Sequence, residues 1–253
     1  MGLLITSRSS ESPWISSVWA SRSAGVSQMT SVASETWGLV FWASDGTSYA
    51  AVTGPEEHTR TAPVPADARF VGIQFAVGTA LRMAPTSSFV NSGLELPDTT
   101  AGRFWLDGAR WSTPRVDDDA EALVARLVRT GVLVRDPLVT AALDGRLPAG
   151  GSRTLERRFR TVTGLTRSAV GQIERARTAA DLLSCGEEVS VVVGLLGYYD
   201  EPHLARALRR YVGRTAGQLR GGLGGAIGLS HLSDDVVHGL DDAVGVGGGL
   251  AQR

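Results

Sequence analysis

Arginine is concentrated in one stretch of nineteen residues, GYYDEPHLARALRRYVGRT, at positions 197–215. His203, Arg206 and Arg210 stand there at positions i, i+3 and i+7, and residues at this spacing lie on one side of an α-helix. A guanidinium can hold a phosphate, or the O6 and N7 edge of guanine, through two parallel hydrogen bonds. The stretch is therefore typical of a helix that binds an anionic partner. A solvated surface helix is the alternative interpretation.

A second copy of this pattern occurs earlier in the chain. The segment SRTLERRFRTVTGLT (152–166) aligns with EPHLARALRRYVGRT (201–215) at a constant offset of 49 residues, which places Gly164 over Gly213. Internal repetition on this scale indicates two copies of one supersecondary unit. Each copy predicts an amphipathic helix that ends near its glycine.

The elements around the two basic helices are predicted from helix starts and stops. A helix starting at Pro137 precedes the first copy, and a helix over 189–196 precedes the second. A short helix, a tight turn and a basic helix, present twice, form the helix-turn-helix arrangement. Residues 166–186 predict a connecting helix of about 18 residues, roughly 27 Å long. Such a strut would let the two basic helices enter successive major grooves, about 34 Å apart.

Residues 136–220 resemble the C-terminal DNA-binding domain of AraC/XylS-type bacterial transcription regulators. The resemblance is most specific in 197–215, where Gly-Tyr, Asp, His-Leu, Arg, Arg-Arg, Gly and Thr stand at the family's spacing. It implies two helix-turn-helix units that bind DNA sequence-specifically. It also implies an N-terminal domain, often cupin-like, that senses a ligand or mediates dimerisation. Leu208 replaces the family's usual Phe, and Arg167 and Ala216 replace its prolines.

The resemblance also implies which side chains contact DNA. Three residues of each basic helix would face the bases, while Arg160, Arg209 and Arg210 would hold phosphates, which position the protein without specifying sequence. Ser152 joins the set as the expected cap of the first helix, as Asp200 is of the second. The implied DNA-binding residues are Ser152, Arg153, Glu156, Arg157, Arg160, Glu201, His203, Arg206, Arg209 and Arg210.

The N-terminal half is predicted to be β-rich. Runs of β-branched and aromatic residues at 35–44 and 68–77 are separated by turn signals. A helical pattern begins at Asp117, and the sequence predicts helices and turns from there to Arg220. The predicted fold class is α+β and multidomain, with a β-rich domain that the resemblance makes cupin-like, followed by an all-α double helix-turn-helix domain. The predicted divisions are a β-rich sensor or dimerisation domain at 1–115, a helical linker at 116–135, the DNA-binding domain at 136–220 and a Gly-rich tail at 221–253.

Charge and composition narrow the classes of function. Every basic residue is Arg, and residues 151–220 carry 12 Arg against 7 Asp and Glu, so this segment alone is basic. The single cysteine, Cys185, excludes an intramolecular disulfide and suits the cytoplasm; we expect it to be buried. His58 is the only histidine of the β-rich region, so we expect no metal there, and no spacing suggests a catalytic set. We therefore expect neither a cofactor nor enzymatic activity, and no run of eighteen apolar residues predicts a membrane span.

The favoured hypothesis is a cytoplasmic, sequence-specific transcription regulator whose partner is double-stranded DNA. RNA polymerase, an unidentified small-molecule effector and a second copy of the chain are further candidate partners, and a membrane is not expected. The alternative hypothesis is a small-molecule-binding protein whose helical domain binds DNA weakly, and it rests on the Gly/Pro-rich turn at 144–152. The sequence does not indicate whether the protein activates or represses transcription, which effector it binds or which operator sequence it recognises.

Overall fold

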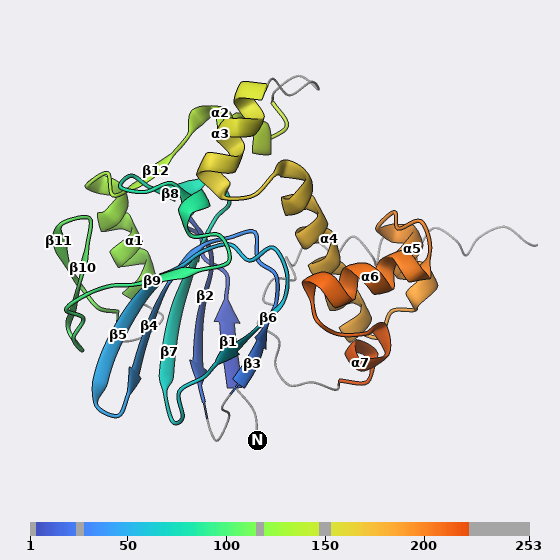
Figure 1. Cartoon of the computed structure of the whole chain (residues 1–253), viewed down its shortest axis with the longest axis horizontal. Helices are drawn as coiled ribbons and strands as arrows, with labels where there is room; N and C mark the ends of the chain where they lie inside the picture. Colours follow the sequence, from blue (N-terminus) through green and yellow to red (C-terminus); the bar gives the residue numbers. More distant parts are fainter. Residues whose placement is uncertain (1–3, 24–27, 115–118, 147–152, 223–253) are drawn as a thin grey trace, which may run out of the picture.

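The computed structural model describes residues 4–23, 28–114, 119–146 and 153–222. Within these ranges a six-stranded antiparallel sheet is followed by a group of α-helices beside it (Figure 1). The predicted α+β class, β-rich first and helical second, is therefore confirmed. None of the helices in these ranges has the length and apolar character needed to cross a membrane.

The six-stranded sheet forms the body of the N-terminal half. Its strands, in spatial order, are β1 (Leu4–Arg8), β2 (Ile15–Arg22), β7 (Arg69–Phe75), β4 (Gly38–Ser44), β5 (Thr47–Thr53) and β9 (Gly93–Glu95). Asp45 and Gly46 join β4 to β5, and their φ angles of 50° and 75° fit a two-residue type I′ turn. This turn is one of the turns predicted between the runs at 35–44 and 68–77, and it fixes the register of the hairpin.

Three two-stranded ladders, a short 3₁₀ helix and one α-helix complete this half. They are β3 (Gln28–Ser31) with β6 (Arg60–Pro63), β8 (Thr79–Leu81) with β12 (Leu133–Arg135), β10 (Arg103–Leu106) with β11 (Ala109–Ser112), η1 (Thr86–Ser88) and α1 (Ala120–Arg129). Leu127 of α1 and Leu133 of β12 are buried in the same apolar cluster as Leu39 and Phe75 of the sheet. The segment predicted as a linker thus packs onto the β-rich half.

The helical half has a core of its own. Its helices are α2 (Pro137–Leu143), α3 (Arg153–Thr163), α4 (Arg167–Ser184), α5 (Val189–Leu195), α6 (Glu201–Tyr211) and α7 (Ala216–Arg220). Phe159, Ile173, Leu183, Leu204 and Leu208 are almost fully buried there. Each such side chain stabilises the fold by about 1.5–3 kcal/mol relative to exposure. This core sets how α3 and α6 are held against α4.

The sequence repeat is reproduced in the backbone. The two basic helices, α3 and α6, each have 11 residues, and each is followed by a glycine in the left-handed region, Gly164 at φ 84° and Gly213 at φ 74°. Two residues later, Thr166 caps α4 and Thr215 caps α7, each accepting a backbone N–H with its side chain. The glycine reverses the chain and the threonine starts the next helix, so both copies turn in the same way.

Most helix predictions are confirmed, and one residue prediction is wrong. The strut α4 has the expected 18 residues, and Pro137 and Val189 begin α2 and α5 as predicted. Cys185, expected to be buried, is exposed, because it caps the C-terminal end of α4 where the helix runs into solvent. Ser152 and the tail from residue 223 onward lie outside the described residues.

A nearly buried ion pair joins the two halves. Arg177 of α4 donates through Nη1 to both carboxylate oxygens of Glu35, at 2.9 and 3.1 Å. The side chain of Glu35 is only 9% exposed and that of Arg177 19%. Close by, the backbone N–H of Ala33 donates to the carbonyl of Tyr211 at 2.8 Å. The β-rich half therefore satisfies a carbonyl at the C-terminal end of α6, where helical partners run out.

The two repeat-related glycines both face the β-rich half. A Cβ at Gly164 would lie 2.8 Å from Val90, and one at Gly213 would lie 3.2 Å from Thr30 and 3.3 Å from Thr59. The missing side chains thus let strand β3 and two loops of the β-rich half approach the ends of α3 and α6 at equivalent positions.

Candidate nucleic-acid interface

Helix α6 separates an apolar side from a charged side. The Asp200 carboxylate accepts the backbone N–H of His203 at 2.7 Å, which confirms Asp200 as the N-cap. Pro202 fits in the first turn, where its missing N–H has no helical partner. Leu204 and Leu208 are buried against α4 and its neighbours. The arginines of this helix, Arg206, Arg209 and Arg210, are all exposed.

Helix α3 repeats the arrangement in the first unit. Leu155 and Phe159 are buried, which fixes the rotation of the helix about its axis. Arg158 forms an ion pair with Asp136, whose carboxylate also caps α2 by accepting from two backbone N–H groups. Burial acts to raise the pKa of Asp136, but Arg158 and the two N–H groups outweigh it, so the pKa is lowered. This carboxylate therefore stays charged and ties α2 to α3.

The side chains predicted to contact DNA lie on the outer sides of the two basic helices. All the described members are exposed except His203, which is half-buried. Glu156 stands 4.0 Å from Arg167 at the start of α4, a distance that gives only a weak exposed pair. On α3 the described members are Arg153, Glu156, Arg157 and Arg160, and on α6 they are Glu201, His203, Arg206, Arg209 and Arg210. Their contacts with DNA stay predictions.

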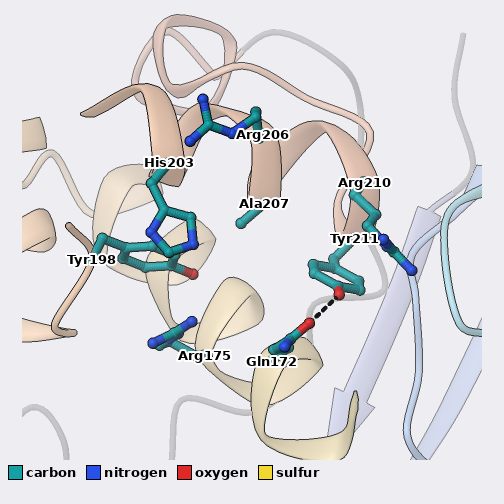
Figure 2. A pocket seen from close by; sticks show the side chains of 8 residues that line it. All are labelled: Gln172, Arg175, Tyr198, His203, Arg206, Ala207, Arg210 and Tyr211. Atoms are coloured by element: carbon teal, nitrogen blue, oxygen red, sulfur yellow. Dashed lines mark hydrogen bonds between the residues drawn. The ribbon is translucent and has the colours of Figure 1, made fainter. Parts of the chain in front are cut away.

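A cavity of about 190 Å³ lies between α4 and α6 (Figure 2). Three predicted site residues of α6 line it together, at the i, i+3, i+7 spacing noted in the sequence: His203, Arg206 and Arg210. The facing wall is made by Gln172 and Arg175 of α4. The remaining lining residues are Tyr198, Ala207 and Tyr211. The cavity therefore lies where the strut helix α4 faces the second basic helix α6.

The walls of this cavity are fixed by local contacts. The Tyr211 hydroxyl donates to Gln172 Oε1 at 2.6 Å, drawn as the dashed line in Figure 2. The Arg175 guanidinium lies 4.6 Å from the centre of the Tyr198 ring, a cation–π distance. His203 packs edge-on against the same ring. Burial raises the pKa of Tyr198, so its hydroxyl stays neutral and can donate a hydrogen bond.

The sequence reasoning missed the residues that α4 and the α5–α6 turn contribute to this cavity. Gln172, Arg175 and Tyr198 lie outside the two basic helices, so the repeat did not single them out. The only signal in the sequence was that Gln172 and Arg175 stand at i and i+3, a spacing that places both on one face of the strut helix. Within the described ranges, no three His, Cys, Asp or Glu side chains gather where they could hold a metal ion.

Residues 151–222 match the family described as helix-turn-helix domain. The match spans both basic helices and the strut between them. These residues form an AraC-type helix-turn-helix domain. The resemblance seen in the sequence is thereby confirmed for this part of the chain.

The chain is similar to a curated transcription regulator and to a solved structure. The HTH-type transcriptional regulator RipA of Corynebacterium glutamicum is 35% identical over 86 residues, which are 33% of this chain and 26% of RipA. The chain therefore matches only about a quarter of the length of that relative. The structure of ToxT from Vibrio cholerae aligns with 89% of this chain and all of its own, at 7% identity and a TM-score of 0.42. Two chains with a score of this size need not share a fold.

Proposed function

We propose that the chain is a sequence-specific DNA-binding transcription regulator that reads two neighbouring segments of the major groove. One observation carries the proposal: an AraC-type helix-turn-helix domain presents two structurally repeated helices whose outward sides are rich in arginine. The similarity to a regulator from Corynebacterium glutamicum supports it. Binding, with no chemical step, is the proposed activity.

The proposed roles follow from side-chain chemistry and exposure. Arg157 and Arg206 are exposed on the two helices and would each hold a guanine edge through two hydrogen bonds. Glu156 and Glu201 would accept from cytosine N4. Arg160, Arg209 and Arg210 would hold phosphates and release counterions, which supplies most of the affinity. His203 is half-buried, so only one edge of its ring would reach the DNA.

We further propose that the β-rich half controls the DNA-binding half. The Glu35–Arg177 pair and the contacts at both capping glycines support a mechanical connection between them. On this proposal residues 1–115, extended by the linker at 116–135 that packs on the sheet, sense an effector or a second copy of the chain, while residues 136–220 bind DNA. RNA polymerase is a proposed further partner, and the cytoplasm the proposed location.

The test is the salt dependence of binding to duplex DNA, measured with the full chain by fluorescence anisotropy. If about 6 phosphates are neutralised, log K should fall with log salt at a slope of roughly −5. A flat dependence would refute DNA binding through this surface. It would favour a small-molecule-binding protein, whose support in the sequence, the Gly/Pro-rich turn, lies mostly outside the described residues.

A further inference from the structure

The cavity between α4 and α6 gathers positive charge without a carboxylate in its walls. Arg175, Arg206 and Arg210 line it together with His203, and none of its lining residues is acidic. An anion placed in this cavity would be attracted by each of these guanidinium groups. The walls therefore suit a negatively charged group.

Two buried polar atoms of the cavity lack a well-aligned hydrogen-bond partner. These are Nε of Arg175 and the Tyr198 hydroxyl, within the described part of the chain. Arg175 lies close enough to that hydroxyl to counteract part of the rise in its pKa, but it does not satisfy the hydroxyl's own proton. Tyr198 is only 5% exposed. His203 accepts the Tyr199 N–H through Nδ1 at 3.4 Å, which leaves Nε2 to carry the proton and donate. Buried donors that lack an acceptor are costly, so an oxygen-rich ligand would be stabilised here.

The size of the cavity selects the kind of anion. At about 190 Å³ it is smaller than the roughly 300–1,000 Å³ of pockets that enclose drug-sized ligands. A single phosphate group is small, carries its charge on several acceptor oxygens and matches the planar fork of a guanidinium. Figure 2 shows Arg175 on α4 and Arg206 on α6 at opposite sides of the space, with Arg210 one helical turn further along α6.

We propose that this cavity holds one backbone phosphate of bound DNA, with Arg175 as a contact from the strut helix and Arg210 as its partner from α6. The Arg210 guanidinium points past Tyr211 in Figure 2 and would turn back toward the cavity when the phosphate binds. The proposal rests on the DNA-binding function proposed above and extends its interface to α4. Arg206 lines the opposite side of the cavity and is exposed, so it stays available for a base edge. The phosphate would thus fix α6 against the DNA backbone at the place where Arg206 reads sequence.

The experiment measures the salt slope of DNA binding for the wild type, Arg175→Gln, Arg210→Gln and the double variant. One phosphate contributes about 0.9 to the slope. Because both arginines contact the same phosphate, the double variant should lose about 0.9 in total, and neither single variant should lose more. A loss of about 1.8 in the double variant would mean two separate phosphates and would overturn the shared site. An unchanged slope for Arg175→Gln, with the double variant no different from Arg210→Gln, would also overturn it.

Two matched variants separate charge from packing. Arg175→Lys keeps the charge and should keep the wild-type slope, whereas a purely structural role over the Tyr198 ring predicts equal losses of affinity for Lys and Gln with no change in slope. Arg126→Gln makes the same change in an arginine that lies 5.6 Å from the centre of the Trp111 ring in the β-rich half, and it should bind DNA as the wild type does. Melting temperatures without DNA identify any variant that fails to fold.

A second arm distinguishes the source of the anion. Inorganic phosphate is compared with chloride at equal ionic strength, and the melting temperature is read without DNA. If phosphate stabilises the wild type but not Arg175→Gln, while the DNA slope of the variant is unchanged, the site takes a free anion and the proposal of a DNA phosphate is wrong. If the wild type binds no DNA at all, the proposed function fails, and the cavity proposal fails with it.

Discussion

Replacing Arg177 with Met should destabilise the contact between the two halves far more than replacing Glu35 with Gln. Loss of Arg177 leaves the Glu35 carboxylate, 9% exposed, without its cation. Burial raises the pKa of Glu174, and the nearby Glu35 carboxylate raises it further. Without Arg177, these two carboxylates would therefore lie close together with no cation between them. Removing one partner of a buried pair costs about 3–5 kcal/mol, and the partial exposure of Arg177 places this case near the lower value, about 3 kcal/mol.

Glu35→Gln should lower the free energy of unfolding less, by about 1–2 kcal/mol, because an unpaired Arg177 still reaches solvent at 19% exposure. The double variant should cost less than the sum of the two, since it leaves no buried charge. Two probes follow urea unfolding. All six tryptophans lie between residues 14 and 111, so their fluorescence reports the β-rich half, while far-ultraviolet circular dichroism is dominated by the helices.

The two probes should coincide in the wild type and separate in Arg177→Met, because the contact that couples the halves is weakened. Arg220→Met is the matched control: its pair with Glu188 is exposed, at 37% and 65%, and should contribute about 0–1 kcal/mol. The reasoning is refuted if Arg177→Met and Arg220→Met unfold alike, with coincident probes in both.

Three further outcomes are expected. Burial raises the pKa of Asp181 from 3.8 to about 6, so its charge destabilises the fold as pH rises through that window. Asp181→Asn should therefore raise the free energy of unfolding above pH 6 by roughly 1–2 kcal/mol after allowing for solvent, and not below pH 4, as measured by urea unfolding. The Arg8 guanidinium holds the pKa of Glu121 at about 2, so Glu121→Gln should cost at most about 1 kcal/mol at pH 7, measured by urea unfolding, and nothing once pH falls to 2. Gly213→Ala should lower the melting temperature more than Gly197→Ala, because both have positive φ but only Gly213 has neighbours within 4 Å; equal effects would argue against the contact with the β-rich half.

Local signals allowed much of the helical half to be predicted. The offset of 49 residues identified both basic helices, and the Asp200 cap and the glycines at 164 and 213 marked their limits, because caps and left-handed turns depend on a few adjacent residues. The strut length followed from the spacing between the two copies. The helical period predicted that both basic helices are amphipathic, and Leu204 and Leu208 form the buried side of α6.

Contacts between distant segments could not be predicted. Glu35 and Arg177 are 142 residues apart in the chain, and no periodicity connects them. The cavity arises where α4 crosses α6, so Arg175 gained its place from tertiary packing that the repeat does not encode. Cys185 was expected to be buried from its residue type, but its position at the end of α4 decided its exposure.

Selection from a library of randomised DNA duplexes with the full chain tests the central claim most directly. The account predicts an enriched motif with two blocks about one helical turn apart, one for each basic helix. Repeating the selection with Arg206→Ala should weaken the sequence preference in one block and leave the other block unchanged, because Arg206 belongs to α6 and each block is read by one basic helix. Binding that enriches no motif and disappears at higher salt would contradict the account, since it would show a basic surface that does not read sequence.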